Sequence, residues 1–352
     1  MLHPTVWVVV RRPAWRRMAG WATLRRQQGF DVQVLDPADA GRLQQAPPSH
    51  VLLVGHPRAA GAYLLPTAEH PPPCRHMATA FHGDHAVVHG SLAEPPRHAV
   101  GRLPVHDDAE LERVLARYLR PLPAEPAVVR FVDGDPRWGS AINRACHLLA
   151  GRAARRAWPA GLASTRASFN PVAPAALRAD VVAWIAQGAR LLVYVGHGQP
   201  DHVDGIHAHA LPVDGGSVGV VVLACCHAGG FAADAPSLAE RWLLTPGGPR
   251  AILAASNVSD PRLNPALADA FVRAALLPGA TVGDAVLAAR RALDGAAEDP
   301  IYAALRLCAP PRLRRAHRGL YNLLGDPTAP VGLVVADAAL ASGTTGAKAA
   351  AP

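Results

Sequence analysis

Two segments of the sequence combine residue types that can carry out nucleophilic catalysis. An apolar run at residues 191–195 leads directly into a Gly-His-Gly triplet centred on His197. A second apolar run, residues 218–224, leads directly into Cys225 and Cys226. A cysteine attacks as its thiolate, and a nearby imidazole can generate or stabilise that anion. Glycines beside the histidine let a substrate backbone approach closely and leave amide N–H groups available to stabilise an oxyanion.

Because both apolar runs have the length of a strand, we expect both groups at the carboxyl ends of strands. Continuous apolar strands are typical of parallel sheets covered on both faces, and sites in such sheets form at the carboxyl ends of strands. Each pattern alone also fits a structural role, since Gly-His-Gly is a common turn and a buried cysteine behaves as a small hydrophobe. Their joint placement, 29 residues apart (226 minus 197), favours a catalytic site.

The rest of the chain predicts alternating strands and helices, so the expected fold class is α/β. Prolines 121, 123 and 126 separate a smaller N-terminal half, residues 1–120, from a larger half, residues 126–337. The expected strands are residues 5–10, 31–35, 51–54, 98–105, 128–132, 191–195, 218–224 and 251–255. The expected helices are residues 14–28, 107–119, 140–154, 175–187, 237–244, 265–275 and 282–293. Residues 66–75 are predicted as a loop and residues 338–352 as a disordered tail.

An ordered series of motifs resembles the gingipain family of cysteine peptidases, which are relatives of the caspases. YVGHGQP at residues 194–200 resembles the family's histidine motif, and ACCHAGGF at residues 224–231 resembles its cysteine motif. The other similar segments are PSLAERWL (236–243), GGPRAILAASN (247–257), YNLLGDPT (321–328) and, upstream, residues 24–35, 50–55 and 100–105. The resemblance covers about residues 5–335 in consistent order. It implies a cysteine endopeptidase whose caspase-like catalytic half has a largely parallel sheet covered by helices.

The resemblance also implies which residues carry out catalysis. In the family the nucleophile precedes a phenylalanine by five residues, so Phe231 selects Cys226 rather than Cys225. Strand alternation agrees that only one of the two adjacent cysteines can meet the histidine, since neighbours on a strand point to opposite faces. His197 matches the general acid/base, and the backbone N–H groups of Gly198 and Cys226 match the oxyanion hole.

An acidic residue that orients the histidine is the third catalytic group that the resemblance implies. Asp133 falls where the family carries this residue, at the end of the expected strand at residues 128–132. Asp135 lies two residues further on and can serve instead. A carboxylate in this place would fix the imidazole tautomer and stabilise the imidazolium.

The residues expected around the substrate pocket depart from the family pattern. Members that cut after arginine carry an acidic residue low in the primary pocket, but this place falls near Trp138, beside Arg137. Ser256 and Asn257 lie in the segment that resembles the pocket-lining loop, and the usual capping aromatic after them is missing. Arginine specificity is therefore not expected. Arg137 can favour an acidic substrate side chain or can be an ordinary surface residue.

A histidine-rich segment follows the Gly-His-Gly triplet. His202, His207 and His209, with Asp201 and Asp204 close by, are residue types that bind metal ions. The segment is short, contains glycine and lacks a helix that would fix the spacing of ligands. We expect a loop beside the active-site cleft, with no metal and no cofactor. A metal hydrolase built on the three histidines is an alternative function.

The composition excludes several classes of protein. The chain has 352 residues, of which 50% are hydrophobic and 18% charged, so general disorder is excluded. No apolar run approaches the ~18 residues that a membrane-spanning helix needs. The N-terminus lacks the features of a signal peptide, so a cytoplasmic location is expected. Five cysteines without a CxxC pair predict reduced thiols rather than a disulfide framework or a structural zinc site.

The expected partner is a protein or peptide substrate. The formal net charge of +8 comes from scattered arginines, with few aromatic residues between them to stack bases, so no nucleic-acid partner is expected. No membrane partner is expected either, and the oligomeric state is left open. An inactive caspase-like scaffold that binds another protein is a further alternative, because one fold can host unrelated functions. The presence of both Cys226 and His197 argues against it.

Overall fold

The computed structural model describes residues 3–45, 48–73, 79–121, 128–135, 148, 151, 163–168, 174–210, 218–294 and 309–333. Its strands are β1 (Thr5–Val9), β2 (Asp31–Leu35), β3 (His50–Val54), β4 (Ala68–His70), β5 (Phe81–Gly83), β6 (Ala99–Leu103), β7 (Val128–Asp133), β8 (Ala163–Ser168), β9 (Ala189–Val195), β10 (His202–Val203), β11 (Ile206–His207), β12 (Val218–Ala224), β13 (Ala251–Ala255) and β14 (Tyr321–Gly325). Its α-helices are α1 (Arg12–Trp15), α2 (Ala19–Gln27), α3 (Asp84–His89), α4 (Asp108–Leu119), α6 (Pro174–Gln187), α7 (Leu238–Leu244), α8 (Asn264–Ala275), α9 (Val282–Ala292) and α11 (Pro311–Leu320). Short 3₁₀ helices are η1 (Arg16–Met18), η2 (Pro37–Gln44), η3 (Gly61–Tyr63) and η4 (Ala208–Ala210).

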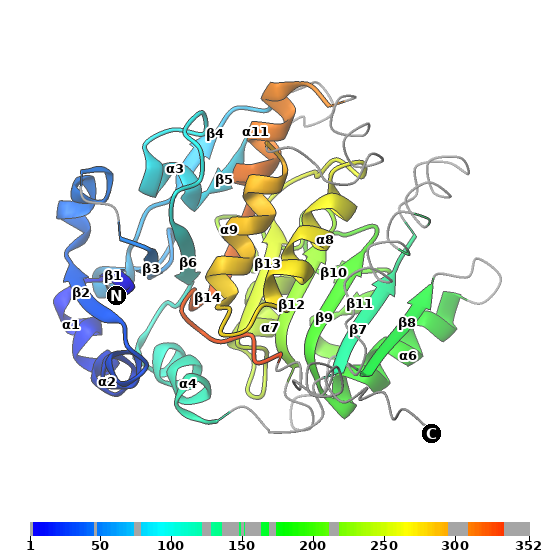
Figure 1. The fold of residues 1–352 in the computed structure, drawn as a ribbon, viewed down its shortest axis with the longest axis horizontal. Coiled ribbons are helices and arrows are strands. Elements are labelled where there is room, and N and C mark those ends of the chain that lie inside the picture. The colour runs from blue at the N-terminus through cyan, green and yellow to red at the C-terminus, as the bar shows by residue number, and fades with distance from the viewer. Residues whose placement is uncertain are drawn as a thin grey trace, which may run out of the picture.

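A central sheet of ten strands organises the fold, with helices on both sides of it (Figure 1). The strand order is β2-β1-β3-β6-β14-β13-β12-β9-β7-β8. All eight strands that the sequence predicts are found in this sheet, and β2 and β12 have the predicted bounds. The predicted α/β fold class is therefore confirmed.

The sheet consists of two parallel halves that run in opposite directions. Strands β2, β1, β3, β6 and β14 are parallel to one another, and so are β13, β12, β9, β7 and β8. Within the described part of this ten-stranded sheet, the single antiparallel pair is β13 with β14, where Ala251 pairs with Gly325 and Ala255 with Tyr321. The carboxyl ends of the strands in one half-sheet consequently lie on the same side as the amino ends of the strands in the other. Strand β14, from the end of the chain, completes the half-sheet that begins with the N-terminus.

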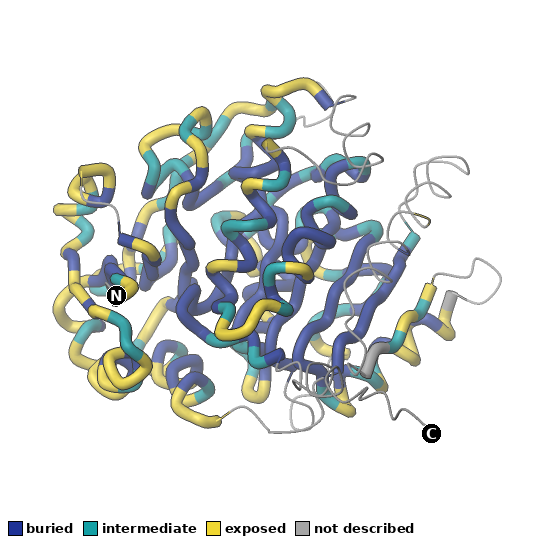
Figure 2. Tube along the Cα trace, viewed as in Figure 1, coloured by how far each residue is buried: buried dark blue, intermediate teal, exposed yellow. Residues whose placement is uncertain are grey.

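Buried apolar residues cover both faces of the sheet, as Figure 2 shows by the dark colour of its strands. On one face, a cluster joins alternate strand residues such as Val220 and Val222 to helices α2, α4, α8 and α9. On the other face, Val221 and Leu223 belong to a second cluster with α6 and α7. A third cluster with η2 and α3 covers that face of the N-terminal strands. Burial on both faces explains why the strands read as continuous apolar runs.

Local structure differs from the sequence expectations at residues 14–28 and 66–75. The predicted helix at residues 14–28 is divided into α1, η1 and α2. The predicted loop at residues 66–75 is wrong in part, because residues 68–70 form strand β4 by antiparallel pairing with β5. The predicted helix at residues 140–154 lies almost wholly outside the described residues, and the predicted tail lies outside them entirely.

A buried ion pair ties the N-terminal helices to the end of strand β14. The carboxylate of Asp326 accepts hydrogen bonds from Arg25 Nη2 at 2.7 Å and from Trp21 Nε1 at 2.5 Å, both on helix α2. Its other oxygen accepts a hydrogen bond from the backbone N–H of Thr328 at 2.8 Å. Arg25 and Asp326 are almost completely excluded from solvent. This arrangement gives the Gly-Asp-Pro motif at residues 325–327 a structural role.

Among the helices that the structure describes, none has both the length and the apolar character required to cross a membrane.

Candidate active site

The loops that carry the predicted catalytic residues leave from three adjacent strands, β7, β9 and β12. In the parallel pairing, Val195 of β9 lies opposite both Asp133 of β7 and Ala224 of β12. The backbone continues this alignment past the strand ends, because Gly134 N–H donates to the carbonyl of Val195 at 2.8 Å. Three loops therefore start side by side at one edge of the sheet, as expected for sites in parallel sheets.

Gly198 brings the histidine loop against the cysteine turn. A Cβ atom added to Gly198 would collide with the carbonyl oxygen of Cys226 and come within 2.6 Å of the sulfur of Cys225. Only a residue without a side chain allows the two backbones to approach this closely. The requirement explains the glycine that follows His197, and it places the histidine next to the turn that carries Cys226.

The two adjacent cysteines have different environments. Cys225 is completely buried in the cluster that includes Leu223 and α7, and burial raises its pKa well above the usual value. Cys226, the next residue along the chain, is partly exposed. A thiol that stays protonated in an apolar core is a poor nucleophile. Cys226 is therefore the better placed of the pair for chemistry.

A strained turn follows Cys226. His227 has a φ of +58°, a left-handed conformation that is uncommon for residues other than glycine. Its backbone N–H donates to the carbonyl of Asn257 at 3.0 Å, and the N–H of Ala228 donates to the carbonyl of Cys226 at 2.7 Å. These bonds hold the unfavourable conformation in place, and such strain often occurs at functional sites. The turn redirects the chain immediately after the cysteine.

Ser259 is the residue that contacts the sulfur of Cys226. Its backbone N–H lies 3.3 Å from Sγ, and its hydroxyl oxygen lies 3.7 Å from the same atom. The hydroxyl also accepts a hydrogen bond from Asn264 Nδ2 at 2.9 Å, which holds it beside the sulfur. Both groups can donate to a thiolate and so stabilise the charged form.

The contact with Ser259 is extended by a buried chain of hydrogen bonds. The hydroxyl of Tyr321 donates to Oδ1 of Asn264 at 2.8 Å, which fixes the amide so that its nitrogen faces Ser259. Tyr321 is the first residue of strand β14, and burial raises its pKa well above the usual value, so it remains a neutral donor. Tyr321, at the start of a strand in the middle of the sheet, thus supports the candidate nucleophile through Asn264 and Ser259.

The imidazole of His197 contacts Gln199. Nε2 of His197 lies 3.0 Å from Nε2 of the Gln199 amide. If the amide nitrogen donates, the imidazole nitrogen carries no proton; if the amide is turned by 180°, the imidazole can donate to its oxygen. Gln199 can therefore follow His197 through both protonation states. This is the behaviour that a residue beside a general acid/base needs.

A buried tyrosine and aspartate hold the backbone of the histidine loop. The hydroxyl of Tyr194 lies 2.7 Å from the carbonyl oxygen of His197 and 2.8 Å from Oδ2 of Asp204. Asp204 Oδ2 also accepts a hydrogen bond from the N–H of Asp135 at 3.1 Å. Burial, together with the charge of Asp204, raises the pKa of Tyr194 well above its usual value. The network joins the loops after β7 and β9 through a side chain from β10–β11.

Asp133, the predicted orienting carboxylate, lies at the end of β7 and is buried. Its Oδ2 forms an ion pair with Nη2 of Arg166 on β8, at 2.9 Å. Its backbone pairs with Val195, two residues before His197. The neighbouring Asp135 reaches the histidine loop through its backbone N–H, which is bonded to Asp204. The choice between the two carboxylates as the orienting residue stays a prediction.

The residues predicted around the substrate pocket are only partly described. Arg137 and Trp138 lie outside the described residues. Asn257 is buried, and its amide donates to the carbonyl of Ala80 at 2.8 Å. The hydroxyl of Ser256 donates to the carbonyl of His82 at 2.5 Å. Both side chains thus hold the segment around β5 against the end of β13, and a role in binding substrate stays a prediction for them.

The histidine-rich segment after His197 is a β-hairpin, so the expectation of a loop is wrong. Strands β10 and β11 are joined by Asp204 and Gly205, both with positive φ, as in a type I′ turn. The hairpin brings Asp201, His202 and His207 together, and their side chains are of the kinds that bind metal ions. An Asp-Gly pair flanked by alternating residues is a hairpin signal that the sequence already contained.

Sequence reasoning did not identify Ser259, Asn264, Tyr194 or Gln199 as parts of the site. Gln199 stands two residues after His197, so local spacing could have indicated it. Tyr194 stands three residues before His197, so local spacing could have indicated it as well. Ser259 and Asn264 reach the site only through tertiary packing. The assembled residues provide a partly exposed thiol in contact with the N–H and hydroxyl of Ser259, and a histidine loop whose backbone at Gly198 lies against the cysteine turn. This set is suited to acyl transfer through a covalent intermediate.

Comparison with known proteins places most of the chain in one family. The family model of peptidase family C25 matches residues 3–332. A complex of Porphyromonas gingivalis RgpB pro- and mature domains is similar with a TM-score of 0.68 and 15% identity, covering 93% of this chain and 79% of that chain. The Arg-specific cysteine proteinase gingipain R (RgpB) has a TM-score of 0.65 and 14% identity, covering 93% and 78%.

A third solved structure, of a protease, has a TM-score of 0.71 and 14% identity, covering 92% of this chain and 78% of that chain. No curated protein matches the sequence significantly. The solved structures show that the caspase-like gingipain fold expected from the sequence is present in this chain. The family match carries the chemistry, since it spans both the histidine and the cysteine loops. The chain belongs to peptidase family C25, the gingipain family, and it is a cysteine endopeptidase.

Proposed function

We propose that the chain cleaves peptide bonds through an acyl-enzyme on Cys226, with His197 as the general acid and base. The observation that carries this proposal is the close approach of Gly198 to Cys226, which holds the histidine loop against the cysteine turn. The Cys226 thiolate attacks the substrate carbonyl, and a proton from His197 lets the amine leave. His197 then takes a proton from water, which attacks the thioester and releases the acid.

Backbone groups and a carboxylate assist this reaction. The N–H groups of Gly198 and Cys226 stabilise the oxyanion of the tetrahedral intermediate. Before the attack, the N–H and hydroxyl of Ser259 stabilise the thiolate from the other side. Asp133 orients the imidazole, and Arg166 holds that carboxylate in place. Asp135 takes this role if Asp133 does not.

The substrate is a protein or peptide. Cleavage after arginine is stated for one similar structure, the Arg-specific gingipain R. In this chain Arg137 and Trp138 stand near the place of the acidic pocket residue, which favours a different preference. A cytoplasmic location, and the lack of nucleic-acid and membrane partners, stay predictions that fractionation of the producing cells can test.

A positional-scanning library of internally quenched peptides tests the proposal. The wild-type chain is expected to cleave a subset of the library, and the Cys226→Ala variant is expected to cleave none of it. Alkylation provides a second measurement: iodoacetamide should modify Cys226 much faster than the buried Cys225. Absence of peptide cleavage, together with slow alkylation of both cysteines, would favour the inactive scaffold.

A further inference from the structure

We propose that Asp201, His202 and His207 form a binding site for a divalent transition-metal ion of the zinc type. The site lies on the β10–β11 hairpin, on the chain segment that directly follows His197. Within the part of the chain that the structure describes, it is the one group of three such side chains whose ligand atoms all lie within 4.8 Å of one another. The proposal does not depend on the peptidase chemistry.

The hairpin register brings the ligands together. His202 and His207 are cross-strand partners, as are Val203 and Ile206. Because side chains alternate along a strand, the two histidines share one face of the hairpin while the two apolar residues share the other. Val203 and Ile206 are buried in the core cluster beside α6 and α7, which leaves the histidine face outward.

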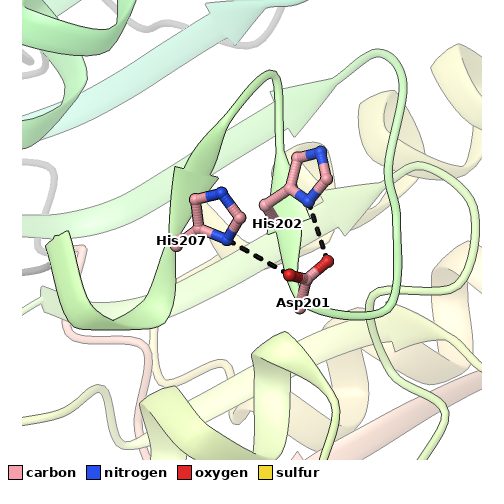
Figure 3. A group of neighbouring side chains, drawn as sticks. All are labelled: Asp201, His202 and His207. Atoms are coloured by element: carbon pink, nitrogen blue, oxygen red, sulfur yellow. Dashed lines mark hydrogen bonds and ion pairs between the residues drawn. The ribbon is translucent and has the colours of Figure 1, made fainter.

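Asp201 lies between the two imidazoles, as Figure 3 shows. Nδ1 of His202 is 2.8 Å from one carboxylate oxygen, and Nδ1 of His207 is 3.2 Å from the other. In a tetrahedral zinc site with bonds of about 2.0–2.1 Å, ligand atoms lie roughly 3.3 Å apart. The two Nδ1 atoms therefore already stand at suitable distances from the carboxylate. An ion would replace the hydrogens that now point at Asp201, with each neutral imidazole carrying its hydrogen on Nε2.

The ligand types and the exposure fit an ion with an open coordination position. Imidazole nitrogen with carboxylate oxygen suits zinc, copper or nickel rather than calcium or magnesium. The side chains of His202 and His207 are 28% and 38% exposed, so an ion can enter from solvent. The ring of His209 stacks on that of His207 at 5.2 Å between centroids, and water can occupy the fourth position.

The surrounding structure holds the site in place. The turn at Asp204 is fixed by the hydrogen bond from Tyr194, and the carbonyl of Pro200 accepts the N–H of Leu238 at 2.6 Å. The two ends of the hairpin's first strand are thus attached to the sheet and to α7. Ligands on such a supported hairpin need little rearrangement to bind an ion, which favours affinity.

Metal binding at this site is connected to the catalytic histidine through Gln199. The N–H of Gln199 donates to the carbonyl of His202 at 2.9 Å, and its side chain contacts His197 Nε2 at 3.0 Å. An ion that joins His202 to His207 therefore stabilises the hairpin to which the histidine loop is attached. Because the ion binds only the folded chain, its presence should raise the unfolding temperature.

Calorimetric titration of the untagged Cys226→Ala protein with Zn²⁺ tests the proposal. The Cys226→Ala background is used because a free thiolate beside an imidazole binds zinc by itself. We expect saturable binding of one ion per chain, together with a rise in Tm. Adding His202→Gln and His207→Gln should weaken binding at least about 100-fold, since loss of even an outer-shell partner costs about 10–100-fold.

A matched control variant is His106→Gln. His106 forms a similar surface pair with Glu110, with Nδ1 3.1 Å from the carboxylate. The ring of His56 stacks on it, but among the described residues these side chains do not belong to a group of three that could hold an ion. This variant should bind Zn²⁺ as tightly as its parent. If the double histidine variant fails to fold by circular dichroism, the single variants His207→Gln and Asp201→Asn replace it, each with an expected loss of at least about tenfold.

Co²⁺ adds a measurement of the ligands themselves. Its visible absorption should show a low-symmetry site with nitrogen and oxygen ligands in the parent protein, and this absorption should disappear in the histidine variants. The proposal is overturned if the Cys226→Ala protein binds no Zn²⁺, or if the histidine variants bind it as tightly as the parent does. Neither outcome bears on the peptidase, because every measurement is made without the nucleophile.

Discussion

The backbone N–H of Ser259 lies 3.3 Å from the sulfur of Cys226, although the residues are 33 positions apart in the chain. The segment after β13 therefore contributes directly to the environment of the candidate nucleophile. This segment also lacks the pocket-capping aromatic residue expected from the family. Ser259 contacts the sulfur through its backbone N–H and its hydroxyl.

Replacing Ser259 with alanine should slow the reaction of Cys226. The substitution removes the hydroxyl, which lies 3.7 Å from the sulfur, and leaves the backbone N–H in place. One hydrogen bond contributes about 1 kcal/mol, which corresponds to a roughly fivefold change in rate. We expect a decrease of about that size in the alkylation rate of Cys226 at pH 7. The Asn264→Ala variant should act in the same direction, and an unchanged rate in both would contradict the assigned role.

Cys226→Ala should abolish peptidase activity, whereas Cys225→Ser should keep most of it. Cys225 is buried and Cys226 is partly exposed, so only the second can reach a substrate. The Cys225→Ser protein should be less stable, because it buries a hydroxyl in an apolar cluster at a cost of about 1–3 kcal/mol. Activity per folded molecule and urea denaturation separate the two effects. A dead Cys225→Ser protein beside an active Cys226→Ala protein would show that the assignment is shifted by one residue.

His197→Ala should lower kcat/KM by about 10²–10⁴ while the protein stays folded. Its side chain is part of the loop surface, and the loop is held mainly by its backbone, through Tyr194 and Gly198. Gln199→Ala should have a smaller effect, because it removes a partner of the imidazole and not the imidazole itself. Steady-state kinetics with circular dichroism as a folding control measures both. Wild-type activity in His197→Ala would exclude the dyad.

Asp133→Asn should lower activity less than His197→Ala does, because a thiolate needs less assistance than a hydroxyl. The substitution also leaves the guanidinium of Arg166 without its anionic partner, which is 2.9 Å away in the wild type. Asp135→Asn is the matched comparison. If Asp135→Asn has the larger effect on kcat, the orienting role passes to Asp135. Equal and negligible effects would indicate a simple cysteine–histidine dyad.

The buried pair of Arg25 and Asp326 should make the protein sensitive to acid. Burial raises the pKa of Asp326, but the charge of Arg25 and hydrogen bonds from Thr328 and Trp21 outweigh this and lower it overall. A carboxyl group whose pKa is lower in the folded state stabilises the fold above its unfolded pKa, about 3.9, and this stabilisation is lost as the pH falls through the folded value.

Urea denaturation at pH 7 and at pH 3 measures this contribution. The wild type should lose stability on acidification, and the Asp326→Asn variant should lose less. At pH 7 the variant should be less stable by about 3–5 kcal/mol, because Arg25 becomes an unpaired buried charge. A Glu94→Gln variant, which breaks an exposed pair with Arg97, should change stability by less than about 1 kcal/mol. Equal losses in the two variants would contradict the buried-pair argument.

The sequence was sufficient to predict elements that depend on local pattern. Strand β12 is found at the predicted residues because seven consecutive apolar or small residues can only be buried on both faces. The helix that begins after Ser237 was predictable as well, since Ser237 and Glu240 form a capping box. The placement of His197 and Cys226 at the carboxyl ends of strands was also predictable, because each residue follows a continuous apolar strand.

Features that depend on long-range packing could not be predicted. Strand β14 lies between β6 and β13, parallel to the first and antiparallel to the second, and no local pattern specifies this arrangement. The hydrogen-bond chain from Tyr321 through Asn264 to Ser259 joins segments that only the folded sheet brings together. The hydrogen bond from the Asn257 amide to the carbonyl of Ala80 could not be predicted either, because it joins residues more than 170 positions apart.

The position of β14 also has a consequence for synthesis on the ribosome. A nascent chain lacks this strand until residues 321–325 have been translated, so the N-terminal half-sheet keeps an unpaired edge beside β6, and β13 keeps another. Contacts of such high sequence separation form late in folding. Tyr321 arrives with the same strand, so the hydrogen bonds that support Cys226 are completed only when the sheet closes. A chain without residues 321–325 would therefore lack both the strand that joins the two half-sheets and the hydrogen bonds that reach Ser259.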